Sequence, residues 1–183
     1  MLATNFKFIA KNLDISNILQ QVLDNPQDWK AVSNYENIGG DLDPPGFLPL
    51  VMAYVQNEND DPKDTELLRD TPLRSKYIEV LNFLKSYGIK NTARAAFFKL
   101  KPGGSVNSHI DIGKYYLTKD RYHLSLQGKY RYTVDGETHI IEPGTFFWFD
   151  NKKFHDAVNI GDEDRITFVF DVPHSPKNPH HLV

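Results

Sequence analysis

The sequence predicts a mainly β protein whose core is a double-stranded β-helix, a jelly-roll or cupin-like barrel, flanked by N-terminal helices. Two observations predict this fold class. From residue 91 onward, short runs alternate between apolar and polar residues, and turn residues separate them about every ten positions. Before residue 91, two segments space their apolar residues as one face of a helix. We expect one domain over residues 1–183, with 1–90 as support, 91–172 as the barrel and 173–183 as a tail.

The first helix is predicted to follow Asp14, which serves as its N-cap. Pro26 cannot continue a helix and disfavours helical geometry at Asn25, so the helix is predicted to end near Asp24. Its buried face consists of Ile15, Ile18, Leu19, Val22 and Leu23.

A loop, a strand and a second helix are predicted before the barrel. Residues 33–47 are rich in Gly and Pro, which predicts a loop, and the apolar run 47–55 predicts a strand. The acidic stretch 57–64 predicts a solvated loop. The second amphipathic helix is capped at its C-terminus by Gly88. Its apolar residues are Leu73, Tyr77, Val80, Leu81, Leu84 and Tyr87.

Eight strands are predicted in the barrel. Turn residues separate them, and Asp135-Gly136 between two alternating runs is a strong signal for a two-residue hairpin. Short strands in such close succession favour a double-sheet jelly roll. The predicted strands cover residues 93–100, 105–111, 121–126, 129–134, 137–142, 145–149, 154–159 and 165–171.

Composition excludes several classes of function. The chain has 21 Lys and Arg against 24 Asp and Glu, a net charge of −3, so we expect neither nucleic acid nor an anionic membrane as a partner. It has no Cys, which excludes disulfides, thiolate zinc sites and cysteine nucleophiles. No run approaches the ~18 apolar residues of a membrane helix, and no secretory signal is recognisable, so we expect a cytoplasmic protein. The expected partner is a small-molecule or peptide substrate.

Two His residues and one Asp have the spacing of a metal site. His109 and Asp111 lie two apart in the predicted strand 105–111, so their side chains point to the same face. His155 follows in another predicted strand. Two imidazoles and one carboxylate form the facial triad that binds non-haem Fe(II) and leaves three positions open. We therefore predict His109, Asp111 and His155 as the metal ligands and catalytic residues.

The other His residues have simpler interpretations. His139 is expected to face solvent in a hairpin. His174, His180 and His181 belong to a Pro-rich segment at the C-terminus, which is expected to lie on the surface.

Arg165 is the first residue of the predicted strand 165–171. Alternation places it on the inner face of the barrel with Thr167 and Val169. A buried Arg is costly unless it meets an anion, and its planar guanidinium suits bidentate capture of a carboxylate. Arg165 is therefore predicted to bind a dicarboxylic cosubstrate; the structural alternative is a buried salt bridge to Asp or Glu.

A second cation and another imidazole begin the strand 121–126. Arg121 and His123 share one face of that strand and are predicted to face the same cavity as cofactor-binding residues. His123 is also an alternative metal ligand in place of His109. It ranks second because no carboxylate lies two residues away.

These motifs together resemble the aspartyl/asparaginyl β-hydroxylase family of iron- and 2-oxoglutarate-dependent oxygenases. The resemblance covers residues 98–172, and the combined spacing is far more specific than any single motif. Its motifs are Lys101-Pro102-Gly103-Gly104, His109-x-Asp111, Arg121-x-His123, Glu142-Pro143-Gly144-Thr145, Phe149-Asp150, His155, and Arg165 before Phe170-Asp171-Val172.

The resemblance implies a role for each predicted site residue. It implies that two His residues and the carboxylate hold Fe(II), that the Arg ten residues after the last His binds the distal carboxylate of 2-oxoglutarate, and that the Arg-x-His pair lies at the same cosubstrate site. These roles fall on His109, Asp111, His155, Arg165, Arg121 and His123. Some animal members lack the carboxylate that Asp111 supplies here.

The implied reaction is hydroxylation of an unactivated C–H bond by O2, with conversion of 2-oxoglutarate to succinate and CO2. An amino acid, a peptide or a protein side chain would be the substrate. No family resemblance is recognised in residues 1–90, which are expected to shape the substrate pocket. Tyr115 and Tyr116, between the two motif strands, are candidates for substrate contact or for packing.

Two other functions are compatible with the same residues. A cupin-type metalloenzyme would use His109, Asp111, His123 and His155 without 2-oxoglutarate. A metal-free jelly roll would bind an anionic ligand through its His and Arg residues. Arg165 favours the 2-oxoglutarate enzyme, because a metal site without a cosubstrate gives it no anion to bind.

Overall fold

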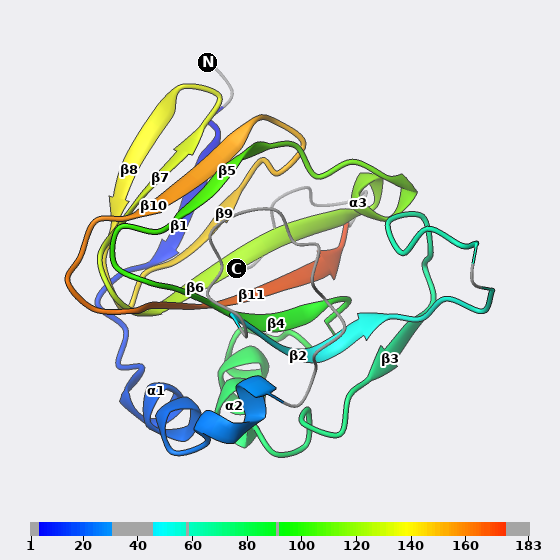
Figure 1. The fold of residues 1–183 in the computed structure, drawn as a ribbon, viewed down its shortest axis with the longest axis horizontal. Helices are drawn as coiled ribbons and strands as arrows, with labels where there is room; N and C mark the ends of the chain where they lie inside the picture. Colours follow the sequence, from blue (N-terminus) through cyan, green and yellow to red (C-terminus); the bar gives the residue numbers. More distant parts are fainter. Residues whose placement is uncertain (1–3, 31–45, 58, 91, 175–183) are drawn as a thin grey trace.

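The computed structural model describes residues 4–30, 46–57, 59–90 and 92–174, which form two facing sheets with helices below the larger one (Figure 1). Most of the loop predicted at 33–47 lies outside the described residues, as do His180 and His181 of the predicted tail.

The larger sheet has seven strands and the smaller sheet has four. In spatial order the larger sheet consists of β1 (Phe6–Ala10), β9 (Phe146–Phe149), β6 (Lys119–Gln127), β11 (Arg165–Pro173), β4 (Ala95–Leu100), β2 (Phe47–Ala53) and β3 (Leu68–Asp70). The smaller sheet consists of β5 (Ser105–His109), β10 (His155–Asn159), β7 (Tyr130–Val134) and β8 (Glu137–Ile141).

The predicted jelly-roll core is confirmed. All eight predicted strands are present as β4 to β11, and every pairing among them is antiparallel. They divide into the order β9-β6-β11-β4 in one sheet and β5-β10-β7-β8 in the other. The chain therefore alternates between the sheets as a double-stranded β-helix does.

Some predicted strand limits are wrong in ways that matter for the site. The strand predicted over 105–111 ends at His109, so Asp111 lies in the loop beyond it. The strands predicted at 121–126 and 165–171 are longer, because β6 and β11 pair over their whole lengths in the middle of the large sheet. The strand predicted in 47–55 is β2.

Two short strands were not predicted. β1 pairs with β9, with Phe6 opposite Phe149, and so extends the edge of the large sheet. β3 has only three residues and pairs with β2. A three-residue strand carries too little alternation to be recognised, since several residues are needed to show a period of two.

The helices partly match their predicted limits. α1 spans Ser16–Leu23, and the Asp14 carboxylate accepts a hydrogen bond from the Ser16 amide at 3.1 Å, although the residue before the helix is Ile15. A 3₁₀ helix, η1 (Pro26–Lys30), follows, as Pro26 requires. α2 spans Ile78–Ser86, so the prediction was wrong to include Leu73, which lies in a turn.

The C-terminal cap of α2 is confirmed at Gly88. Its φ is +72°, a left-handed conformation that favours glycine. The amide of Gly88 donates to the carbonyl of Lys85 and the amide of Ile89 to the carbonyl of Leu84, both at 2.9 Å. This pair of bonds is the Schellman motif, which satisfies the last carbonyls of the helix.

The two faces of the large sheet differ in composition. Its outer face packs on α1 and α2 in an apolar cluster that includes Ile18, Val22, Val80, Leu84, Phe97, Tyr122, Leu124, Phe146, Trp148, Ile166, Phe168 and Phe170. Each of these large side chains contributes about 1.5–3 kcal/mol by its burial. A smaller apolar cluster lies between the two sheets, formed mainly by β7, β8 and β9. Beside it, the inner face of the large sheet carries buried charged residues such as Arg165 and Asp171.

None of the helices within the described ranges has the length and apolar character that a bilayer crossing requires.

Candidate active site

Two imidazoles meet where β5 and β10 pair. His155 lies directly opposite His109 in the antiparallel register, and their ring centroids are 4.2 Å apart. Each residue therefore reaches the site from a strand, and the backbone pairing sets the separation of the two rings.

The proton on each ring is assigned by its hydrogen bond. Nδ1 of His109 lies 2.7 Å from the carbonyl of Asn107, and Nδ1 of His155 lies 2.9 Å from the carbonyl of Lys153. Because a carbonyl only accepts, Nδ1 donates in both cases. Nε2 of each ring is then left as the atom that a metal would bind.

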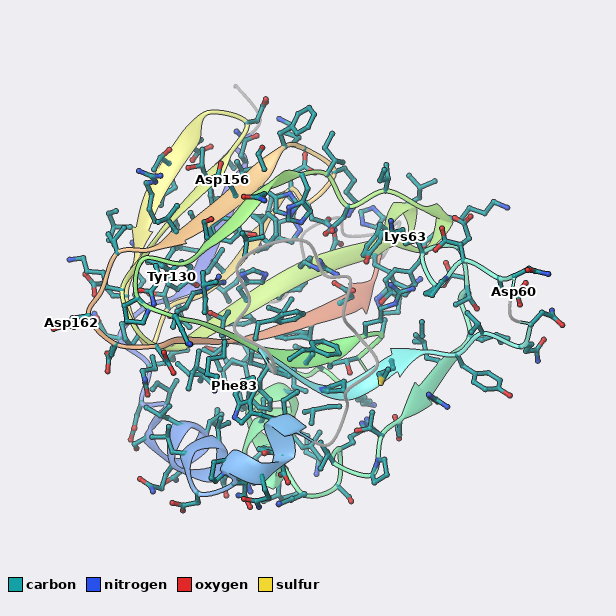
Figure 2. The ribbon with its side chains drawn as sticks, viewed as in Figure 1. Asp60, Lys63, Phe83, Tyr130, Asp156 and Asp162 are labelled. Carbon is teal, nitrogen blue, oxygen red and sulfur yellow. The ribbon has the colours of Figure 1, made fainter. Side chains whose placement is uncertain are left out.

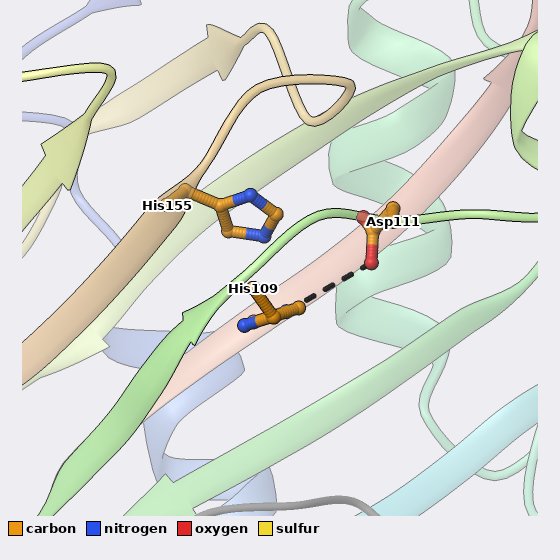
Figure 3. Close-up of side chains that lie close together, drawn as sticks. All are labelled: His109, Asp111 and His155. Carbon is orange, nitrogen blue, oxygen red and sulfur yellow. Dashed lines mark ion pairs between the residues drawn. The ribbon is translucent and has the colours of Figure 1, made fainter.

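Asp111 completes the cluster from outside the strand. Its amide donates to the carbonyl of Asn151 at 3.1 Å, and its Oδ2 accepts from the Asn151 side-chain amide at 2.8 Å. This pairing of two loops, rather than alternation along a strand, places Asp111 beside His109, with 3.9 Å between its Oδ1 and the Nε2 of His109. The three residues offer ligand atoms that all lie within 4.8 Å of one another (Figure 3).

The electrostatics favour a charged carboxylate beside a neutral imidazole. Burial alone would raise the pKa of Asp111, but the charge of Arg121, with His155 and the Asn151 amide, lowers it. Burial lowers the pKa of His155 to about 4, against the opposing charge of Asp111. At neutral pH, Asp111 is therefore ionised and His155 is neutral, the states that metal ligands require.

A cavity of about 710 Å³ opens over the inner face of the large sheet and contains this cluster. It is lined by all six predicted site residues: His109, Asp111, Arg121, His123, His155 and Arg165. The structure thus brings together residues that span 56 positions of sequence, 165 − 109. The cavity is within the size range of small-molecule sites, about 300–1,000 Å³.

Arg165 is a buried cation at one end of the cavity. Only 4% of it is exposed, its Nε donates to the Thr167 hydroxyl at 2.9 Å, and its guanidinium lies over the Tyr130 ring at 4.1 Å. Within the described parts of the chain, no carboxylate lies at ion-pair distance from Arg165. The alternative of a buried salt bridge therefore finds no partner there.

His123 lines the cavity and is affected electrostatically by Arg165 and Arg121. Burial, and then the charges of Arg165 and Arg121, hold its pKa well below the usual value, so the ring is neutral. Its Nδ1 is buried without a hydrogen-bond partner among the described residues. It is not part of the three-residue cluster of potential ligands.

Arg121 is held by two carboxylates. Its Nη1 donates to Asp111 at 2.7 Å, while Nε and Nη2 donate to the two oxygens of Asp171 at 2.8 and 3.0 Å. Arg121 lines the cavity, and its hydrogen bond to Oδ2 also orients the Asp111 carboxylate. This second role depends on Asp171, which is opposite Arg121 in the register of β11 and β6.

Several residues of the site were not found by sequence reasoning. Asn151 and Asp171 belong to the network around Asp111, but a lone Asn in a turn and a lone Asp at a strand end give no recognisable signal.

Tyr115 and Tyr116 lie in a short helix, α3 (Lys114–Leu117). Tyr115 is fully buried and donates to Asp171 at 3.0 Å, so it packs, whereas Tyr116 lines the cavity.

The acidic loop predicted over 57–64 is exposed, but it also forms part of the cavity wall. Asp61, Pro62 and Lys63 line the cavity. The carbonyl of Lys63 accepts from the amide of Tyr115 at 3.2 Å, and a Cβ at Gly113 would lie 2.4 Å from that carbonyl oxygen. Gly113, at φ +126°, thus permits the close contact that holds this loop against α3.

Comparison with protein families supports the resemblance in the sequence. The family model for aspartyl/asparaginyl beta-hydroxylase matches residues 20–175. Among proteins of curated function, no sequence matches this chain.

Several solved structures are similar to about half of this chain. A predicted oxalate decarboxylase from Thermotoga maritima is 21% identical, with 49% of this chain and 73% of that chain covered and a TM-score of 0.39. A cupin domain from Schizosaccharomyces pombe is 17% identical over 49% of this chain and 61% of that one, with a TM-score of 0.41. A cupin protein from Bacteroides fragilis is 17% identical, with 50% of this chain and 74% of that chain covered and a TM-score of 0.39.

Proposed function

Because this chain belongs to the aspartyl/asparaginyl beta-hydroxylase family, we propose that it is an Fe(II)- and 2-oxoglutarate-dependent dioxygenase that hydroxylates a small molecule or peptide. The observation that carries the proposal is the presence of Arg165, a buried cation without a carboxylate partner among the described residues, in the same cavity as His109, Asp111 and His155. A dicarboxylic cosubstrate would supply the missing anion.

The donor set fits a divalent iron. Two imidazoles and one carboxylate on one side of a cavity match the arrangement that leaves three positions open on Fe(II). When bound there, iron with O2 and 2-oxoglutarate supplies the oxidising power that inserts oxygen into a C–H bond while succinate and CO2 form.

The protein's residues hold the reactants and exclude water. Arg165 binds the distal carboxylate of the cosubstrate through its fork of donors, and Thr167 orients the guanidinium. Arg121 and Asn151 hold the Asp111 oxygens in one direction, so the ligand geometry is set before a metal enters. The apolar rings of Phe149 and Tyr132 line the cavity near His123 and keep water from it.

The test is succinate formation from 2-oxoglutarate by the Fe(II)-loaded protein, measured with amino acids and peptides as substrates. The wild-type protein is expected to bind one iron per chain. His109→Ala and His155→Ala are each expected to abolish tight binding, and Asp111→Ala to weaken it. His139→Ala serves as the control, because His139 bonds Glu137 on β8 and does not line the cavity.

Three results would separate this function from the alternatives. Absence of iron binding by the wild-type protein would remove the metal assignment and favour a metal-free binding protein. Metal binding without any affinity for 2-oxoglutarate would favour a cupin-type metalloenzyme of another kind. Succinate formation that requires both Fe(II) and Arg165 would agree only with the proposed function.

A further inference from the structure

Three arginines line the cavity, and they differ in their anionic partners. Arg121 is neutralised by Asp111 and Asp171. Arg165 is assigned above to the cosubstrate. The third, Arg94, belongs to neither group, and the proposed reaction gives it no role.

Arg94 is surrounded by neutral groups. Its guanidinium lies 3.7 Å from the centroid of the Tyr115 ring, its Nη1 donates to the Tyr116 hydroxyl at 3.2 Å, and its Nη2 donates to the carbonyl of Pro62. Its Nε is buried without a partner among the described residues. The cation is therefore held in place by aromatic and carbonyl contacts that leave its charge without a counterion.

Glu66, an acidic residue that Arg94 affects electrostatically, is engaged elsewhere. The pKa of Glu66 is lowered mainly by its hydrogen bond with Lys119, and Arg94 adds a smaller electrostatic effect. The Glu66 carboxylate accepts from Lys119 at 2.6 Å and from Thr118 at 3.0 Å. Across the described ranges, no carboxylate lies within ion-pair distance of Arg94.

Arg94 and Arg165 lie at opposite ends of the cavity floor. Asp171 donates its amide to the carbonyl of Arg94 at 2.8 Å, so Arg94 lies beside the far end of β11. Asp171 is six positions after Arg165 in β11, so their Cα atoms are roughly 20 Å apart at the rise of a strand. In Figure 2, Tyr130, whose ring lies under the Arg165 guanidinium, and Lys63, next to Pro62, lie on opposite sides of the view.

The cosubstrate alone does not satisfy both cations. A five-carbon diacid is far shorter than the separation of the two arginines, so one bound at Arg165 and at the metal ligands does not reach Arg94. Beside Arg94, where Val51 is opposite Ala95 in the register of β2 and β4, the cavity is lined by apolar residues of these two strands, namely Val51, Met52, Ala53, Ala95 and Ala96. This part of the cavity offers a cation at one end and an apolar wall along its side.

We propose that Arg94 binds a carboxylate of the hydroxylated substrate, and that this substrate is an amino acid or short carboxylic acid whose aliphatic chain extends from Arg94 toward the metal ligands. The inference rests on the proposed function. It assigns the substrate class and names Arg94 as the specificity-determining residue, with Tyr116 orienting its guanidinium from the cavity wall.

The test compares each acid with its own primary amide. Succinate formation by the Fe(II)-loaded wild-type protein is measured with twenty L-amino acids, a series of unbranched aliphatic acids, and the amides of all of them. At least one acid is expected to stimulate turnover, and its amide is expected to show a KM higher by about 30-fold or more, because the amide lacks the charge that pairs with the guanidinium.

Variants at position 94 assign that discrimination to the arginine. Arg94→Ala is expected to raise the KM for the acid by about 30-fold or more, so that the KM values of the acid and its amide become similar. The affinity for the cosubstrate is expected to change by no more than about a factor of two. Arg94→Lys is expected to restore part of the discrimination, since it keeps the charge but not the fork. Arg131→Ala is the matched control, because Arg131 is exposed on β7 and outside the cavity.

Several results would overturn the inference. Equal KM values for acids and amides in the wild-type protein would do so without any variant, as would a panel in which no acid stimulates turnover. Retention of the acid preference in Arg94→Ala would assign the anion to another residue. In each of these cases 2-oxoglutarate still binds to the Fe(II) protein; loss of that binding in the wild type would instead remove the proposed function, and this inference with it.

Discussion

The two faces of β11 carry opposite kinds of residue. On the outer face, Phe168 and Phe170 are fully buried against the helices and neighbouring strands. On the inner face, the same nine-residue strand carries Arg165, Thr167 and Asp171, which are equally buried but polar or charged. One strand therefore contributes to a hydrophobic core on one side and to the candidate active site on the other.

The difference shows how the fold tolerates a charged interior. Burial of aromatic side chains on the outer face stabilises the sheet, whereas desolvation of the inner charges costs free energy unless each charge meets a partner. Asp171 has that partner in Arg121, but Arg165 has no carboxylate nearby in the described structure. The outer face thus supplies the rigidity that lets the inner face hold a cation for a ligand.

The largest expected effect is on the outer face. Phe168→Ala should lower the free energy of unfolding by about 3–5 kcal/mol, because it removes a buried ring. The centroid of that ring lies 5.0 Å from that of Phe97 and 5.2 Å from that of Phe170. Guanidinium unfolding followed by circular dichroism measures this. Phe154→Ala is the control, since Phe154 is 61% exposed and should change stability by less than about 0.5 kcal/mol. Similar losses in both variants would contradict the division between the faces.

Next in size is the loss of Arg165 from the inner face. Arg165→Ala should reduce 2-oxoglutarate affinity by about 30-fold or more, which corresponds to at least ~2 kcal/mol, while iron binding persists. Arg165→Lys should recover only part, since an ammonium lacks the fork. Titration of the Fe(II) protein with 2-oxoglutarate, followed by its charge-transfer absorbance, measures the affinity of the wild type and of both variants. If all three proteins bind equally well, Arg165 has a structural role.

A smaller effect is expected from the residue that orients Asp111. Asn151→Ala removes the 2.8 Å hydrogen bond to Asp111 and should weaken iron binding by about 10- to 100-fold. Competition with a metal chelator measures the affinity independently of turnover. Asn17→Ala, on the exposed surface of α1, should leave it unchanged. Wild-type affinity in Asn151→Ala would mean that Arg121 alone holds the carboxylate.

The smallest effect concerns the loop that closes the wall of the cavity. The Lys119 ammonium holds the pKa of Glu66 below its ordinary value of 4.5, so the pair stabilises the fold above that pH and loses its effect as the pH falls through the folded-state value. More than half of the Glu66 side chain is exposed, and solvent screens the pair. Glu66→Gln should therefore cost less than about 1 kcal/mol at pH 7, and the cost should diminish as the pH falls below 4.5. A difference in stability that grows on acidification would show the opposite linkage.

Much of the candidate site followed from local patterns. The period of two in 165–171 indicated correctly that Arg165 and Thr167 share a face, and the turn residues indicated the eight strands. The position of Asp111 was predicted for a different reason from the one observed. The strand ends before it, and its amide bonds a loop 40 residues away, a contact that no local pattern specifies.

The loop over 57–64 is a second case in which contacts distant in sequence decide the structure of the cavity. Its acidic composition indicated a solvated loop, and its side chains are indeed exposed. Its part in the cavity wall arises from a backbone carbonyl, that of Lys63, and from a glycine on another loop, Gly113. Backbone contacts of this kind depend on φ and on close approach, neither of which is visible in the order of side chains.

By itself, the sequence determined the fold class, the eight strands of the barrel, the face on which each strand residue lies, and the set of His, Asp and Arg residues suited to a metal and a carboxylate. The reason is that periodicity, turn chemistry and side-chain type are local properties. Only the tertiary structure decided which charges are neutralised. Arg121 pairs with two carboxylates, whereas Arg94 and Arg165 face the cavity without one in the described chain, because the pairing of a buried charge depends on strands and loops far apart in the sequence.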